Sequence, residues 1–221
     1  MENFEKLLIS LPVLVFSVVC HEVAHAWVAR REGDNTAYLL GRITLNPIPH
    51  IDPVGSILVP GILAATNAGI IFGWARPVPV DPRNFRDYKG GDIRVSLAGV
   101  AVNLILAVFF TLLLAAVLAF QGSAPGLATT WGLLERMFSY GVIINLALAV
   151  FNLIPIPPLD GSHVLFHLLP PRLALRYREL ARYGMLLVIA FVMLGGSFLI
   201  GLPVWWLAGL LGSLAQGIAG A

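Results

Sequence analysis

Charged side chains are scarce in this chain. Lys and Arg number 14 and Asp and Glu number 12 among 221 residues, which makes 12% of the sequence. A typical globular protein is about 25% charged, so the composition excludes an ordinary water-soluble domain. The net charge of +2 is too small to indicate nucleic-acid binding. The single cysteine, Cys20, excludes an internal disulfide. We expect a small buried hydrophobic side chain there, and its position beside His21 leaves a metal role open.

Long apolar runs take the place of the missing charge, since 58% of the residues are hydrophobic. A bilayer core of about 30 Å needs about 20 apolar residues per helix. Four runs meet this length: Leu7–Val28, Val95–Phe120, Gly132–Ile154 and Met185–Leu211. The first lacks a basic start and a small-residue cleavage site, so we expect a retained helix. The composition predicts an all-α polytopic membrane protein with a single membrane-embedded domain, residues 1–221.

A fifth apolar run, residues 51–72, is interrupted by Pro53 and by Pro60-Gly61. Basic residues cluster before it, after it and before the last run. The positive-inside rule places all three clusters in the cytoplasm of a multi-pass protein of the cell membrane. A full crossing at 51–72 would separate the first two clusters, so a re-entrant or broken segment is predicted. The clusters are Arg30, Arg31 and Arg42; Arg76, Arg83, Arg86, Lys89 and Arg94; and Arg172, Arg176, Arg178 and Arg182.

Two segments between the apolar runs are rich in β-branched or aromatic residues, which predicts short extended or β segments. They are Tyr38–Leu45 and Gly73–Val80. The prolines of the second segment confine it to a sheet edge or to irregular structure.

The sequence His21-Glu22-Val-Ala-His25 lies inside the first apolar run. Residues i and i+4 of a helix share one face, so both histidines can bind one metal ion. Glu22, on the adjacent flank, can act as general base toward water at that metal. Hydrogen-bonded histidines of a helix bundle are the alternative. Ionisable groups inside a membrane are costly, however, which favours a functional site.

A catalytic zinc ion usually has three protein ligands and an open position for water. Asp160 is the foremost candidate for the third ligand, because it follows the fourth apolar run and three helix-breaking prolines. Its alternative role is to cap the next helix. If 51–72 makes no net crossing, Asp160 and His25 lie on the same, cytoplasmic side.

His163 and His167 form a rival set, because they are also spaced i and i+4 and could share a helix face with Asp160. They lack a neighbouring glutamate, so we expect interfacial histidines or histidines that support the ligands. His50 lies in a loop rich in Asn, Asp and Pro, where a loop-shaping role is expected and a place near the site stays open.

These motifs resemble the site-2 protease (peptidase M50) family of intramembrane zinc metalloproteases, in particular its short prokaryotic branch without a PDZ domain. The stretch from His21 to His25 matches the family's metal-binding helix, and Asn152 to Gly161 matches its Asn-Pro-x-Pro-x-x-Leu-Asp-Gly-like element. Further similar segments are Leu45-Asn46-Pro47, His50-Ile51-Asp52-Pro53-x-Gly55, Gly73-Trp74-Ala75-Arg76-Pro77-Val78-Pro79-Val80 and Ser96-Leu97-Ala98-Gly99.

The resemblance implies a zinc metalloendopeptidase that cleaves transmembrane protein substrates in or near the bilayer. It implies zinc bound by His21, His25 and Asp160, with Glu22 as general base and acid. It also implies that Asn152 holds the substrate or polarises its carbonyl group. Two features depart from the family: Val100 stands where a proline is usual, and the common helix before the His-Glu helix is absent.

Two other functions use the same residues. A metal transporter would employ the His and Asp groups as a transit site, without a need for Glu22. An inactive relative would bind membrane partners only, and the intact ligand set argues against it. An extended substrate of the protease could add as a strand beside 38–45 or 73–80.

Overall fold

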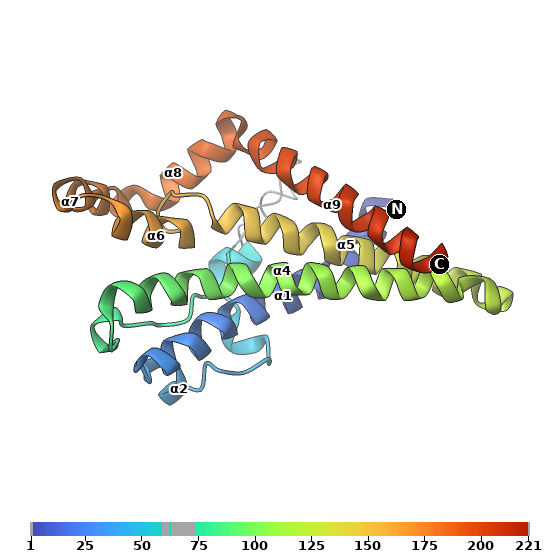
Figure 1. Cartoon of the computed structure of the whole chain (residues 1–221), viewed down its shortest axis with the longest axis horizontal. Coiled ribbons are helices and arrows are strands. Elements are labelled where there is room, and N and C mark those ends of the chain that lie inside the picture. The colour runs from blue at the N-terminus through green and yellow to red at the C-terminus, as the bar shows by residue number, and fades with distance from the viewer. Residues whose placement is uncertain (1, 59–61, 63–73, 221) are drawn as a thin grey trace.

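The computed structural model describes residues 2–58, 62 and 74–220 of the chain. Four candidate membrane spans lie in this part, and each contains one long apolar helix. These helices are α1 (Glu2–Glu32), α4 (Tyr88–Phe120), α5 (Ala128–Asn152) and α9 (Ser197–Gly220). The predicted all-α polytopic membrane fold, with four clear spanning helices, is therefore confirmed (Figure 1).

Shorter helical elements connect the long helices. The α-helices are α2 (Thr36–Leu39), α6 (Asp160–Leu168), α7 (Pro171–Glu179) and α8 (Gly184–Phe191). The 3-10 and π elements are η1 (Ile48–His50), η2 (Pro53–Leu58), η3 (Pro82–Asn84), η4 (Gln121–Ser123), η5 (Pro125–Leu127), η6 (Leu180–Tyr183) and η7 (Val192–Gly196). The described residues include no β-strand.

The predicted extended segment at 38–45 is wrong at its start, because Tyr38 and Leu39 belong to α2. The carboxylate of Asp34 accepts the Thr36 N–H at 3.1 Å and so begins this helical turn. Gly41, with φ +65°, turns the chain after it. Residues 74–80 form neither helix nor strand, in keeping with their prolines.

The ends of the long helices follow local chemistry. Gly33, with φ +118°, follows the last residue of α1, and a side chain there would lie 2.8 Å from the Asn84 carbonyl oxygen. Asp87 caps α4 by accepting the Gly90 N–H at 3.0 Å. Prolines 155, 157 and 158 prevent α5 from continuing beyond Asn152.

Helix α4 lies at the centre of the molecule and packs against α1, α5, α6 and α9 (Figure 1). A buried apolar cluster joins the four long helices: Val13, Ala107, Phe110, Val142, Leu146 and Val204. Gly141 of α5 allows this packing, because an added Cβ would lie 2.4 Å from the Phe110 ring. The outer faces are apolar as well, with Ile105 and Leu112 more than half exposed. Such surfaces are suited to lipid.

One end of the bundle holds the last turn of α1, the first turn of α4 and the α6–α7 region, while both termini lie toward the other end (Figure 1). Part of each basic cluster therefore lies at this end: Arg30 and Arg31 in α1, Lys89 in α4, and Arg172 and Arg176 in α7. Two hydrogen bonds join the flanks of the 51–72 run: Trp74 N–H to Gly55 O at 3.1 Å and Arg76 N–H to His50 O at 2.9 Å. Trp74 and Arg76, which follow the run, thus lie beside Gly55 and His50 at its start. Its course through 59–61 and 63–73 lies outside the described residues.

Candidate metal centre

Three potential ligand atoms from two distant parts of the chain converge in the bundle. The Nε2 atoms of His21 and His25, on α1, are 2.9 Å apart. Oδ2 of Asp160, the first residue of α6, lies 3.2 Å from the first and 3.4 Å from the second. Within the described part of the chain, no other group of three such side chains is close enough to hold a metal ion. The structure therefore brings together the three residues that the sequence singled out.

The hydrogen bonds of the two histidines engage Nδ1 and turn both Nε2 atoms toward one another. Nδ1 of His21 lies 2.6 Å from Oδ1 of Asn103, and Nδ1 of His25 lies 2.7 Å from the Val95 carbonyl oxygen. Because both partners are acceptors, each Nδ1 carries a proton, and Nε2 is the ring nitrogen left to bind a metal ion. The two Nε2 atoms face one another at 2.9 Å. The nearby Asp160 Oδ2 is buried without a hydrogen bond among the described residues.

The spacing of the three atoms fits a zinc ion. Bonds of 2.0–2.1 Å in tetrahedral geometry place neighbouring ligand atoms about 3.3 Å apart. The observed separations of 2.9, 3.2 and 3.4 Å are close to that value. Two imidazoles and one carboxylate also leave a fourth position for water, as in catalytic zinc sites.

A buried polar chain connects His21 to the neighbouring helices. Asn103 donates from Nδ2 to Asn145 Oδ1 at 2.9 Å, and Asn145 donates from Nδ2 to Ser17 Oγ at 2.8 Å. Asn103, Asn145 and Ser17 are fully buried. These residues were not among the candidates predicted from the sequence, although amide side chains in apolar helices are a usable signal, since they are costly without partners. The chain fixes the ring of His21 against α4 and α5.

Gly99 of α4 lies directly behind both imidazole rings. An added Cβ would be 2.5 Å from His21 Cε1 and 2.5 Å from His25 Nε2. The absence of a side chain at this position therefore lets α4 approach α1 closely enough for Val95 and Asn103 to reach the histidines.

Glu22 is held by the irregular segment of residues 74–81, which precedes η3. Its Oε2 accepts the Val78 backbone N–H at 2.8 Å, and Oε1 has no hydrogen-bond partner among the described residues. Arg42 fixes the same segment by donating from Nη2 to the Arg76 carbonyl oxygen at 2.9 Å. The backbone of this segment thus orients one carboxylate oxygen of Glu22.

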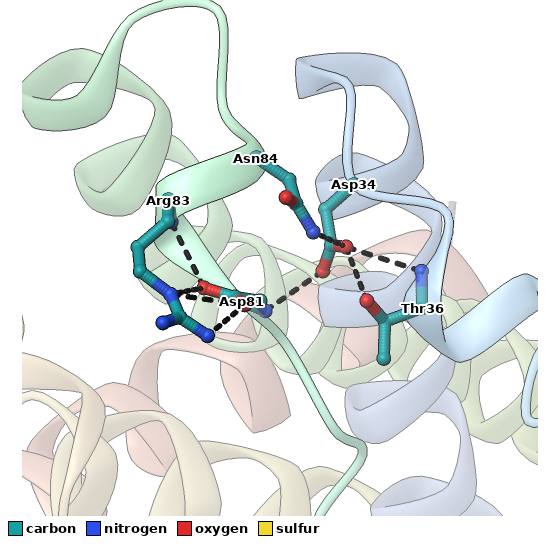
Figure 2. Close-up of polar contacts among 5 residues, drawn as sticks. All are labelled: Asp34, Thr36, Asp81, Arg83 and Asn84. Atoms are coloured by element: carbon teal, nitrogen blue, oxygen red, sulfur yellow. Dashed lines mark hydrogen bonds and ion pairs between the residues drawn. The ribbon is translucent and has the colours of Figure 1, made fainter.

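The far end of that segment is anchored on Asp34, just beyond α1 (Figure 2). This fully buried carboxylate accepts the Asp81 N–H at 2.8 Å and the Asn84 side-chain amide at 2.9 Å. It also accepts hydrogen bonds from the backbone and the hydroxyl of Thr36. Burial raises the pKa of Asp34, but these hydrogen bonds outweigh burial and hold the pKa below its usual range. Asp34 thereby fixes residues 78–81 against the end of α1.

The loop before α6 aims Asp160 at the histidines. Asp160 does not cap α6: the N-cap is Leu159, and no side chain caps the helix there. Gly161 packs so closely on the end of α5 that an added Cβ would lie 2.1 Å from the Leu153 carbonyl oxygen. Tyr177 of α7 supports the loop by donating from its hydroxyl to the Pro155 carbonyl oxygen at 2.9 Å.

The other candidate residues lie outside the ligand group. Asn152 donates from Nδ2 to the Leu148 carbonyl oxygen of its own helix at 2.9 Å. His50 is buried, and its Nε2 lies 3.0 Å from the Thr44 carbonyl oxygen, which agrees with a loop-shaping role. His163 and His167 both contact Asp92 of α4 and do not join Asp160 in a ligand set. Cys20 is half-buried and also lies outside the ligand group.

Several known proteins are similar in sequence to this chain over most of its length. The profile of "Peptidase family M50" matches residues 115–195, which include Asn152 and Asp160. "Putative zinc metalloprotease YwhC" of Bacillus subtilis is 42% identical over 188 residues, covering 85% of this chain and 81% of that protein. "Putative zinc metalloprotease Rip2" of Mycolicibacterium smegmatis is 30% identical, over 80% of this chain and 64% of its own length. "Putative zinc metalloprotease MJ0611" of Methanocaldococcus jannaschii is 29% identical, over 74% of this chain and 73% of its own length.

No solved structure gives a significant match. The similarity to YwhC and the matching profile show that this multi-pass membrane protein belongs to peptidase family M50.

Proposed function

We propose that the chain is an intramembrane zinc endopeptidase, in which His21, His25 and Asp160 bind one zinc ion and Glu22 is the general base. The convergence of the three ligand atoms, with both Nε2 atoms turned toward one another beside a buried carboxylate, is the observation that carries the proposal. The names of the relatives, which include the words zinc metalloprotease, support the choice of metal.

Glu22 performs the proton transfers in the proposed reaction. A bound zinc ion supplies a Lewis acid that polarises the scissile carbonyl group and makes water acidic near neutral pH. Oε1 of Glu22 takes a proton from the attacking water, whose oxygen bonds to the carbonyl carbon. As the C–N bond breaks, Glu22 returns that proton to the leaving amine and is regenerated. The Val78 N–H holds Oε2 throughout and keeps the carboxylate oriented. Asn152, near the same loop, would hold the substrate backbone through Oδ1 and its remaining N–H.

The depth of the histidines supports cleavage within the membrane. His21 precedes the end of the candidate span Glu5–Glu32 by 11 residues, or roughly 17 Å of helix. Part of each basic cluster lies in the last turn of α1, the first turn of α4 or α7, at the end of the bundle that also holds α6 (Figure 1). The positive-inside rule assigns that end to the cytoplasm of the cell membrane. Water would then reach the site from the cytoplasm.

The substrate is a transmembrane protein whose peptide bonds must be exposed locally, because an intact helix hides them. The irregular segment 74–80, pinned by Arg42, Glu22 and Asp34, is the proposed surface along which an extended substrate lies. Metal transport, the alternative drawn from the same ligands, gives no reason for the oriented carboxylate of Glu22 or for membership of a peptidase family.

The full-length protein in nanodiscs, with a model transmembrane substrate, tests the proposal. We expect one zinc ion per chain and cleavage by the wild type. The Glu22→Ala variant should retain zinc and lose cleavage by at least about 100-fold, since general-base catalysis contributes 10²–10⁴-fold. Glu179→Gln, an exposed carboxylate on α7, is the matched control and should cleave normally. Cleavage by Glu22→Ala at the wild-type rate would overturn the assignment.

A further inference from the structure

One face of α4 supports each helix that bears a ligand. Val95, Gly99 and Asn103 follow one another at intervals of four and are buried against α1, where they orient or accommodate His21 and His25. Asp92 lies on the same face, three residues before Val95, and is also buried. It contacts neither histidine of α1, and the proposed reaction assigns it no role.

Asp92 instead bonds to α6, the helix that begins with the ligand Asp160. Its Oδ2 lies 2.8 Å from Nε2 of His167 and 3.3 Å from Nδ1 of His163. The side chains of Asp92 and His167 are only 7% and 5% exposed. Hydrogen bonding to Asp92 also raises the pKa of His163, which strengthens its attraction to the carboxylate. No other polar side-chain contact joins α4 to α6 among the described residues.

Helix α6 has little means of holding its own position. It spans nine residues, which is too short to be stable alone in water, and its N-terminus lacks a side-chain cap. Its place is therefore set by its neighbours: the end of α5 behind Gly161, and α4 through Asp92. Because His163 and His167 are one and two turns beyond Asp160, a shift of α6 along α4 would move the Asp160 carboxylate by a similar distance.

We propose that Asp92 is a positioning residue for the metal site, which holds α6 through His163 and His167 so that Asp160 meets His21 and His25. The inference rests on the proposed zinc ligands. Metal ligation tolerates displacements of about 0.5 Å, and groups that orient ligands typically contribute 10–100-fold to metal affinity. Helix α4 would then orient all three ligands: His21 through Asn103, His25 through Val95, and Asp160 through Asp92.

The test measures metal binding by the full-length protein in nanodiscs, with Zn²⁺ affinity from competition with a chelator and ligand geometry from the Co²⁺ absorption spectrum. We expect Asp92→Ala to weaken zinc binding 10–100-fold and to change the cobalt bands. Asp92→Asn, which keeps one acceptor oxygen, should weaken it less. His167→Ala should have a similar effect, and the double variant should add little, because both changes break one contact.

The control is Glu32→Gln, which removes the charge of an ion pair between the last residue of α1 and Arg94 of α4, the residue before Val95. It should leave zinc affinity and the cobalt spectrum unchanged. His167→Ala decides the question if Asp92→Ala fails to fold. Wild-type zinc affinity and cobalt bands in folded Asp92→Ala or His167→Ala would overturn the positioning role while the proposed function stands. A wild type that binds no zinc would overturn both.

Discussion

Oδ1 of Asn103 lies 2.6 Å from Nδ1 of His21, and both side chains are buried at the centre of the bundle. This contact keeps the proton of the ring at Nδ1 and leaves Nε2 for the proposed metal ion. Asn103 is itself held by Asn145, so the orientation of a proposed ligand on α1 depends on α4 and α5 together.

We predict that Asn103→Leu lowers zinc affinity about 10–100-fold, because the ring of His21 loses its acceptor and Asn145 loses a partner. Competition with a chelator measures the change. Thr111→Val is the matched control: Thr111 is also buried on α4, but its hydroxyl bonds to the Ala107 carbonyl of its own helix. Equal zinc affinities in Asn103→Leu and the wild type would show that the tautomer of His21 needs no fixing by Asn103.

We predict that Gly99→Ala abolishes stoichiometric zinc binding. The new Cβ would stand 2.5 Å from atoms of both imidazoles, and neither ring can move without losing its Nδ1 acceptor. Zinc content of the purified protein checks this. Gly209→Ala on α9 is the control, because nothing lies within 4 Å of its added Cβ, and it should bind zinc normally. Full zinc content in Gly99→Ala would mean that α4 and α1 separate easily.

Removal of the metal should lower the thermal stability of the wild type, since a ligand that binds only the folded state adds about 4 kcal/mol at 1,000 times its Kd. Unfolding in detergent with and without a chelator measures the difference. In Asp160→Asn this difference should shrink strongly, because the anionic ligand is gone. Asp52→Asn, a change in a carboxylate that accepts the nearby backbone N–H groups of Val54 and Gly55, should keep the full difference. A chelator effect as large in Asp160→Asn as in the wild type would remove Asp160 from the ligand set.

The spanning helices and the three proposed ligands could be predicted from the sequence, because apolar length and i, i+4 spacing are local properties. The partners of those ligands could not. Two contacts depend on how α4 packs against α1 and α6: the one between Asn103 and His21, and the one between Asp92 and His167. The Val78 N–H that holds Glu22 has no signature at all, since every residue except proline offers that group.

The prediction of an extended segment at 38–45 was wrong at its start for a related reason. Its composition favours strands, but the side chain of Asp34 begins a helical turn at Thr36, and the Arg42 N–H closes it on the Ala37 carbonyl at 2.9 Å. The local structure at 36–42 thus depends on a residue with long-range contacts, because the same Asp34 carboxylate also accepts hydrogen bonds from Asp81 and Asn84 (Figure 2).

We predict that Asp34→Ala lowers the stability of the fold by about 1.5–3 kcal/mol, the usual value of hydrogen bonds to a buried charge, and also lowers the rate of cleavage. The second effect follows because residues 78–81 lose their anchor and Val78 no longer holds Glu22 firmly.

The pKa of Asp34 in the folded protein lies below its usual value of about 3.9, so its stabilising effect is complete above that pH and is lost as the pH falls below it. Urea unfolding of the metal-free protein should therefore show a difference between the wild type and Asp34→Ala that is constant from pH 7 to pH 5 and smaller at pH 3. Working without metal keeps protonation of the zinc ligands out of the comparison. Glu179→Gln serves as the control and should unfold like the wild type at each pH. A difference that grew on acidification would mean that the Asp34 carboxylate is strained by burial rather than stabilised by its four donors.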